Sequence, residues 1–242
     1  MNCPLKMIMS TIAHNLQAVD ASILAAASAA GRPRAAVRLL AVSKTFPAEA
    51  VLEAIAAGQH AFGENYLQEA LDKITAISQA LPGTPVEWHF IGPIQSNKTR
   101  PIAAHFDWVH TVERLKIAQR LSEQRAEELG PLNICLQVNI SGEVSKSGAT
   151  PDELLELARH VAQLPRLRLR GLMAIPEPEP DFNKQRAAFR RLRELADSLI
   201  AHGIALDTLS MGMSADLAAA VAEGSTMVRV GSAIFGVRKY ES

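Results

Sequence analysis

The chain has 242 residues, of which 48% are hydrophobic, and its 25 lysines and arginines balance its 25 aspartates and glutamates. This composition is typical of a globular protein with a substantial buried core. The charge balance provides no electrostatic attraction for nucleic acid or for an anionic membrane, so a small molecule is the expected ligand.

The cysteines, histidines and apolar segments of the sequence argue against a disulfide-stabilised, metal-binding, secreted or membrane-spanning protein. Cys3 and Cys135 are far apart and lack His or Cys neighbours at ligand spacing, which supports neither a disulfide framework nor a zinc site and suits a reducing compartment. The seven histidines form no HExxH pattern, so no metal site is predicted. Neither a signal-peptide pattern nor a run of ~20 apolar residues is present, and a cytoplasmic location without membrane contact is expected.

The predicted elements begin with an alanine-rich helix over residues 8–30, with apolar residues at helical spacing. Short apolar runs then alternate with longer helical stretches such as AEAVLEAIAAG and NYLQEALDKITAIS. The runs that predict strands are, in chain order, VRLLAVSK, HAFGE, VEWHFIG, DWVHTV, NICLQVNI, LRLRGLMAI, LDTLSMGM and MVRVGSAIFG.

This alternation predicts βαβ units and a parallel sheet. Eight units in a chain near the typical ~250 residues predict an α/β fold, a closed (β/α)8 TIM barrel with an extra N-terminal helix, and an open doubly wound sheet is the alternative. The PEPEPD stretch at 176–181 is one loop within a unit, and no composition change divides the chain. Residues 1–242 are therefore predicted to form a single domain.

Functional residues of such a barrel gather at the carboxyl ends of its strands. Lys44 lies there after the first strand, on the same strand face as Leu40 and Val42, while Arg229 shares a face with Met227 and Gly231. A lone lysine at a strand end usually extends its charge into water. Two cations pointing into one barrel favour a different role, since a desolvated lysine near a fixed positive charge keeps the neutral amine that attacks carbonyls.

The last two units add a candidate anion site. Phosphate sites in these barrels lie in the loops after strands seven and eight, which here read SMGMSADL and VGSAIFG. Ser214 is predicted at the start of a helix, whose positive end suits an anion. Taken singly, Ser214 is explained as a helix cap and Gly231 as a turn glycine.

An amine, an anion cradle and an arginine together match pyridoxal 5'-phosphate (PLP), which has an aldehyde, a phosphate and a pyridine nitrogen. An arginine, always charged, leaves that nitrogen unprotonated, whereas an aspartate makes the ring a strong electron sink. The arginine suits either a racemase that suppresses side reactions or a protein that holds the cofactor without reacting it.

Several long segments, in order along nearly the whole chain, carry a family resemblance: AVSKTFP, FGENYLQE, WHFIGPIQSNK, VNISGEVSKSG, GLMAIPEP, LSMGMS and VRVGSAIFG. At these residues the sequence resembles the YggS/PROSC family of PLP homeostasis proteins, which share the barrel of the alanine racemase N-terminal domain. Two positions depart from the family pattern. Ala215 replaces a common aspartate, which affects only a surface or capping role, and Ser232 replaces a frequent threonine but keeps the hydroxyl.

The resemblance implies a role for each candidate site residue. Lys44 forms the Schiff base with PLP, Asn65 lies beside the cofactor, and Arg229 faces the pyridine nitrogen. The residues implied to hold the phosphate are Ser210, Ser214, Gly231 and Ser232. Met173 and His89 are expected in the pocket wall.

The resemblance further implies PLP storage and delivery that limits free aldehyde, with apo PLP-dependent enzymes as possible recipients and no catalytic residues. The alternative function is a PLP-dependent amino-acid racemase, which needs a second base. In alanine racemase that base is a tyrosine from a partner subunit's C-terminal β domain, whereas this chain ends after its predicted eighth strand. Neither Tyr66 nor Tyr240 is obviously placed for the role, so a non-catalytic, monomeric carrier is expected.

Overall fold

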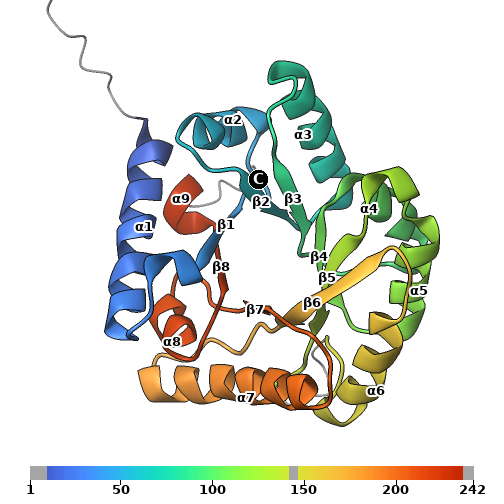
Figure 1. Ribbon diagram of the computed structural model, residues 1–242. Helices are drawn as coiled ribbons and strands as arrows, with labels where there is room; N and C mark the ends of the chain where they lie inside the picture. Colours follow the sequence, from blue (N-terminus) through green and yellow to red (C-terminus); the bar gives the residue numbers. More distant parts are fainter. Residues whose placement is uncertain (1–9, 142–146, 237–242) are drawn as a thin grey trace, which may run out of the picture.

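The computed structural model describes residues 10–141 and 147–236. Within them, eight parallel strands close into a barrel in the order β1-β2-β3-β4-β5-β6-β7-β8, which confirms the predicted fold (Figure 1). The strands are β1 Arg38–Val42, β2 Ala61–Glu64, β3 Glu87–Phe90, β4 Trp108–Val112, β5 Leu132–Gln137, β6 Leu167–Met173, β7 Thr208–Ser210 and β8 Met227–Val230. Cys3 and Tyr240 lie outside the described residues.

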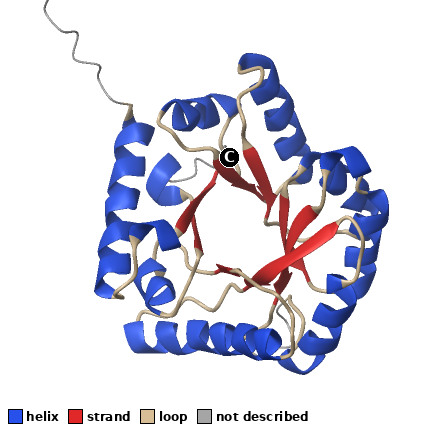
Figure 2. Cartoon of the chain, in the orientation of Figure 1, coloured by secondary structure: helices blue, strands red, loops and turns tan. Residues whose placement is uncertain are grey.

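The helices form a ring around the strands (Figure 2). Their bounds are α1 Thr11–Ala29, α2 Ala48–Ala56, α3 Leu67–Ala80, α4 Thr99–His105, α5 Leu115–Gln124, α6 Pro151–Ala162, α7 Phe182–Ala201, α8 Leu217–Ala222 and α9 Ser232–Phe235. In the part of the chain that the structure describes, no helix is both long enough and apolar enough to cross a membrane.

The extra N-terminal helix α1 begins where Ser10 accepts a hydrogen bond from the backbone N–H of Ala13. One face of α1 is buried, and the helix packs against α2, α8 and α9. The side-chain amide of Asn15 donates to the carbonyl of Ile234, at 2.9 Å. Helix α1 therefore joins the last elements of the chain to the first and covers the seam where β8 pairs with β1.

Strand residues alternate between two apolar environments, as the two-residue period requires. One set packs outward among the helices, as Phe62 and Val228 do in the main core. The other set fills the barrel interior in small groups, one with Leu40, Ala61 and Met227 and another with Trp108, Cys135 and Met173. Burial raises the pKa of the Cys135 thiol to about 12, so this side chain is an inert neutral part of the interior.

Candidate functional site

A cavity of about 330 Å3 opens at the carboxyl-terminal mouth of the barrel. Its wall combines two basic side chains, small polar groups and apolar side chains from the strand ends and the loops that follow them. The lining residues are Val42, Lys44, Phe46, Asn65, Ile91, Ile175, Met213, Ser214, Ala215, Arg229, Gly231, Ser232 and Gly236. A larger hollow of about 800 Å3 lies on the outer surface beside α1 and α2 and contains none of the predicted site residues.

Six of the nine predicted site residues share this wall: Lys44, Asn65, Ser214, Arg229, Gly231 and Ser232. The structure differs from the expectation for His89, Met173 and Ser210, which are fully buried and do not line the cavity. All three belong to the strands themselves, whereas the wall is made mostly of residues that follow the strands. Their side chains therefore lie deeper in the barrel, below the cavity.

Lys44 lies in a sharp turn directly after β1. The next residue, Thr45, has a left-handed backbone with φ +68°, which is strained for a β-branched residue. Its N–H donates to Oε1 of Glu69, on α3, at 2.6 Å. A side chain from a neighbouring helix therefore holds the backbone immediately after Lys44.

A buried charged cluster holds the residue before Lys44. The ammonium of Lys73 donates to the carbonyl of Ser43 at 2.6 Å and forms ion pairs with Glu64 at 2.7 Å and Glu69 at 2.6 Å. The hydroxyl of Ser43 also donates to Oε1 of Glu64, at 2.6 Å. Burial raises the pKa of Glu64, and the nearby Lys73 opposes that shift. We call Ser43, Glu64, Glu69 and Lys73 the lysine clamp, because it fixes both backbone neighbours of Lys44.

Asn65 follows β2 and brings a buried amide to the cavity. Among the described residues, its Oδ1 atom has no hydrogen-bond partner. Its backbone passes so close to Gly92 that a Cβ on that glycine would lie 2.1 Å from the Asn65 carbonyl oxygen. Only glycine at position 92 permits this approach. Buried polar atoms are normally satisfied, so the Asn65 side chain is suited to a ligand donor.

Arg229 crosses from β8 to the cavity wall with only 4% of its surface exposed. Its Nη1 group donates to the carbonyl and the hydroxyl of Ser210, at 2.6 and 2.8 Å, and its Nη2 group donates to the carbonyl of Ala174, at 3.0 Å. Burial lowers the pKa of Arg229 to about 10, which leaves the guanidinium charged at neutral pH.

Ser214, Gly231 and Ser232 form the polar side of the wall expected to hold an anion. A Cβ on Gly231 would lie 3.0 Å from the carbonyl of Val42, so glycine allows β8 to approach β1 closely there. The predicted helix start is displaced, since α8 begins at Leu217 rather than at Ser214. In the intervening turn Asp216 accepts from the N–H of Met213, at 2.5 Å, and Ala215 faces the cavity.

Sequence reasoning missed the lysine clamp and His110. Glu69 and Lys73 are four residues apart on α3, a spacing that places them on one helix face, and Glu64 belongs to the FGEN segment. The Glu69–Lys73 spacing could have predicted an ion pair on this helix. His110 in DWVHTV carried no signal, because its partner Ser210 is 100 residues away.

Among the described residues that line the cavity, only Lys44 and Arg229 carry a titratable side chain. Tyr66 is 53% exposed and does not belong to the wall. The described residues also contain no group of three or more His, Cys, Asp or Glu side chains placed to hold a metal ion. The cavity thus offers an amine, a guanidinium, an amide and two hydroxyls.

Comparisons with known proteins show what this chain is similar to. Residues 12–239 match the family model described as alanine racemase, N-terminal domain. A pyridoxal phosphate homeostasis protein of Pseudomonas aeruginosa is 65% identical over 96% of this chain and 98% of its own length. The protein with the same description from Escherichia coli K12 is 57% identical over 96% of this chain and 99% of its own.

Solved structures agree with this relationship. PipY of Synechococcus elongatus, determined with PLP bound, is 38% identical, has a TM-score of 0.81, and is matched over 93% of this chain and 100% of its own. Alanine racemase from Corynebacterium glutamicum, at 20% identity and a TM-score of 0.65, matches 97% of this chain and 63% of its own, and shows the shared fold alone.

Proposed function

Because this chain belongs to the alanine racemase N-terminal domain family, and within it to the pyridoxal phosphate homeostasis proteins, we propose that it binds PLP in the cavity at the barrel mouth. Its function is intracellular PLP homeostasis: it stores or delivers the cofactor and limits the free aldehyde. The observation that carries this function is the wall itself, where one amine and one buried guanidinium lie among small polar groups.

The residues of the cavity fit PLP group by group. Asn65 offers a buried amide oxygen with no partner among the described residues, and the ring hydroxyl of PLP is a donor for it. Ser214 and Ser232 offer hydroxyls to the phosphate, beside the glycine at 231. Arg229 would hold the pyridine nitrogen, and Phe46 and Ile91 supply apolar wall for the ring.

Lys44 is the residue proposed to bind the cofactor covalently, as a Schiff base. Among the described lining residues it carries the only amine. When bound, PLP supplies an electrophilic aldehyde and an electron-withdrawing ring. The lysine clamp supports this role, because it fixes the backbone on both sides of Lys44 and so restricts where the amine can point.

A non-catalytic role is part of the proposal. A racemase needs an acid and a base on opposite faces of its substrate, and the described wall carries only Lys44 as a candidate base. Arg229 stays protonated and would leave the pyridine nitrogen uncharged, which weakens the ring as an electron sink. The proposal includes apo forms of PLP-dependent enzymes as recipients, a monomeric state and a cytoplasmic location.

Borohydride reduction tests the covalent assignment. The PLP-loaded protein is reduced, digested and analysed by mass spectrometry, and we expect the reduced adduct on Lys44 and its loss in Lys44→Ala. Lys116→Ala, at an exposed position on α5, serves as the control and should keep the adduct. An adduct on another lysine would contradict the assignment.

A paired assay separates carrier from racemase. The loaded protein is incubated with single L-amino acids and assayed for the D-isomer by chiral chromatography, and the same preparation is tested for reactivation of an apo-enzyme. We expect reactivation without racemisation. Formation of D-amino acid at enzyme-like rates would favour the racemase instead.

A further inference from the structure

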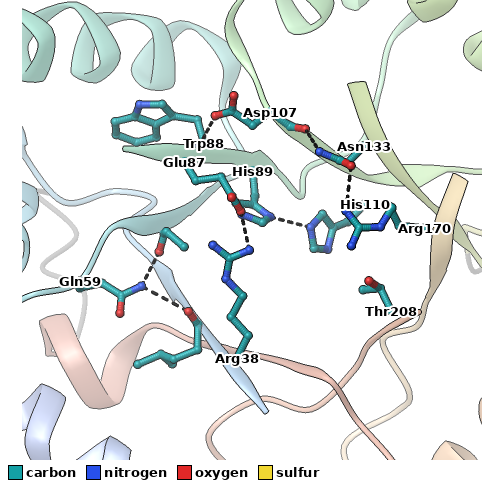
Figure 3. A network of polar contacts seen from close by, with 12 residues as sticks. Arg38, Gln59, Glu87, Trp88, His89, Asp107, His110, Asn133, Arg170 and Thr208 are labelled. Atoms are coloured by element: carbon teal, nitrogen blue, oxygen red, sulfur yellow. Dashed lines mark hydrogen bonds and ion pairs between the residues drawn. The ribbon is translucent and has the colours of Figure 1, made fainter. Parts of the chain in front are cut away.

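A line of hydrogen bonds runs through the barrel interior below the cavity. The hydroxyl of Ser210, which contacts Arg229 at 2.8 Å, lies 2.8 Å from Nδ1 of His110. Nε2 of His110 lies 2.9 Å from Nδ1 of His89, and Nε2 of His89 lies 2.5 Å from a carboxylate oxygen of Glu87. Figure 3 shows the two imidazoles pointing toward one another with Glu87 beside His89. We call Ser210, His110, His89 and Glu87 the axial relay.

The axial relay connects opposite ends of the barrel. Arg229 belongs to the cavity wall at the carboxyl-terminal mouth, whereas Glu87 starts β3 at the amino-terminal mouth. There Glu87 pairs with Arg38, the first residue of β1, at 2.8 Å, as Figure 3 also shows. Arg38 and Glu87 are partly exposed, whereas Ser210 and the two histidines are fully buried.

The donor in each bond can be assigned because Arg229, at one end of the line, only donates and the carboxylate of Glu87, at the other end, accepts. Arg229 can only donate, so the Ser210 hydroxyl accepts from it and gives its own proton to Nδ1 of His110. Nε2 of His110 therefore carries a proton and donates to Nδ1 of His89. Nε2 of His89 then donates to the carboxylate of Glu87. Both histidines are thereby assigned as neutral Nε2–H tautomers, and every donor points away from the cavity.

The electrostatics agree with neutral histidines and a charged Glu87. Burial lowers the pKa of His89 and lowers that of His110 well below its usual value, to which the charges of Arg229 and Arg38 add. Burial by itself would raise the pKa of Glu87, but the hydrogen bond from His89 and the charge of Arg38 outweigh it and lower that pKa to about 2. The relay therefore begins at a fixed cation and ends at a fixed anion.

The orientation of the Arg229 guanidinium is set by hydrogen bonds, one of which goes to the first member of the axial relay. Within residues 10–141 and 147–236 it forms no ion pair, and its side chain donates to two carbonyls and to the Ser210 hydroxyl. These three bonds use three of the five guanidinium N–H groups. They fix the plane of the guanidinium and leave two N–H groups for other contacts.

We propose that Ser210, His110, His89 and Glu87 act as positioning residues that orient the Arg229 guanidinium toward the bound cofactor from the opposite end of the barrel. This inference rests on the proposed function, because it assigns to Arg229 the ring nitrogen of PLP. It also gives Ser210 a role other than phosphate binding, since its hydroxyl both accepts from Arg229 and donates to His110.

Two variants break the relay at different points. Ser210→Ala removes the hydroxyl that contacts Arg229, and His110→Phe keeps a ring but removes both nitrogens. PLP is titrated into each full-length protein while the visible absorption spectrum is recorded. We expect about tenfold weaker PLP binding and a shifted absorption maximum in both variants. Ser210→Ala removes a hydrogen bond to the charged Arg229, and His110→Phe removes the acceptor that orients the Ser210 hydroxyl. The double variant should resemble each single variant, since both cut the same line.

Glu87→Gln provides a readout that simple core packing would not affect. Glutamine keeps an acceptor for His89 but removes the negative charge. The charged groups facing His89 are Glu87 and Asp107, which raise its pKa, and Arg38, which lowers it, while His110 faces His89, Arg229 and Arg38. Without Glu87, protonation of His89 requires lower pH. Protonation of His89 stops its Nδ1 from accepting from His110, so we expect the absorption of bound PLP to change as pH falls. The midpoint of that change should lie at lower pH in Glu87→Gln than in the parent protein.

Gln59→Ala is the matched control, because Gln59 lies at the same end of the barrel and, among the described residues, its side-chain amide donates to the backbone carbonyls of Leu39 and Ala61. It should bind PLP with the spectrum and pH profile of the parent. If Ser210→Ala and His110→Phe fold and bind PLP with the parent affinity and spectrum, the inference is overturned while the proposed function stands. If His110→Phe does not fold, the smaller change Ser210→Ala decides. Failure of the parent protein to bind PLP would overturn both.

Discussion

Lys44 and Arg229 both line the cavity of this protein, and the barrel holds their surroundings in contrasting ways. The turn that carries Lys44 is fixed by the lysine clamp, in which a buried ammonium faces two carboxylates. Arg229 is fixed by carbonyls and by a relay whose middle members are neutral. The clamp therefore rests on buried charge, and the relay rests on hydrogen-bond direction.

Substitutions in the clamp and in the relay should therefore differ in how much they destabilise the fold. A buried charge that loses its partner cannot easily be rehydrated, so damage to the clamp should affect the stability of the whole fold. A broken neutral hydrogen bond costs less, because only the desolvation of polar atoms is uncompensated. Changes to the clamp should therefore mainly lower the free energy of unfolding. Changes to the relay should mainly alter the affinity for PLP and its absorption spectrum.

Lys73→Met tests the clamp and has the largest expected effect. It leaves the carboxylate of Glu64 buried without its cation, and we expect the free energy of unfolding to fall by about 3–5 kcal/mol in urea denaturation. Adding Glu64→Gln should restore part of the loss, because the buried charge is then removed. Lys116→Met, at an exposed position, should change stability by less than about 0.5 kcal/mol. A loss below about 1 kcal/mol for Lys73→Met would contradict the assignment.

His110→Phe tests the relay by the same measurement. The phenyl ring fits a similar space, but the Ser210 hydroxyl loses its acceptor and Nδ1 of His89 loses its donor, so we expect a loss of about 1–3 kcal/mol. His160→Phe, on the exposed side of α6, is the control for replacing a histidine. A destabilisation as large as that of Lys73→Met would remove the distinction between the two regions.

Glu87→Gln should have a smaller effect on stability at neutral pH, about 0.5–1 kcal/mol, because its partner Arg38 is 46% exposed. Its pH dependence is more informative. The pKa of Glu87 is lowered to about 2 in the folded protein, so its contribution to stability is present above the ordinary value of 4.5 and is lost as pH falls toward 2. Acid titration of unfolding should show this loss in the parent protein and a flatter curve in Glu87→Gln. Superimposable curves would mean that Glu87 has an ordinary pKa.

Thr45→Gly has the smallest expected effect on stability and tests how the strained turn after Lys44 affects the reaction of that lysine. Glycine relieves the strain of a positive φ but gains freedom in the unfolded chain, so we expect stability to change by no more than about 1 kcal/mol, in the stabilising direction. Because the turn is then less constrained, trapping of PLP on Lys44 by borohydride should be slower. The rate is measured by stopping the borohydride reduction at a series of times and quantifying the Lys44 adduct by mass spectrometry. Faster trapping would show that strain at Thr45 slows the reaction of Lys44 with PLP.

Much of the fold and part of the site could be predicted from the sequence. The alternation of apolar runs and helical stretches predicted the closed barrel, because a two-residue period and a 3.6-residue period are local properties. Lys44, Asn65 and Arg229 could be placed at one mouth, because parallel strands end on the same side. Ser214 lies in the cavity wall, but α8 begins at Leu217, so the predicted helix start at Ser214 was wrong.

The positions of His89, Ser210 and His110 could not be obtained in the same way. A residue at the end of a strand lies either in the wall or below it, and the choice depends on how the neighbouring strands are staggered. Ser210 pairs with Met227 of β8, while His110 reaches it from β4 across the interior. Their contact joins residues 100 apart in sequence, and no local pattern encodes it.

The order of the elements, the lysine at the end of the first strand and the family of the chain could all be obtained from the amino-acid sequence. Three contacts became visible only in the folded chain: Ser210 with Arg229, His110 with His89, and Lys73 with the carbonyl of Ser43 beside Lys44. The physical reason is that side-chain periodicity is set by neighbouring residues, whereas the partner of a buried polar group is set by which strands the closed barrel brings together.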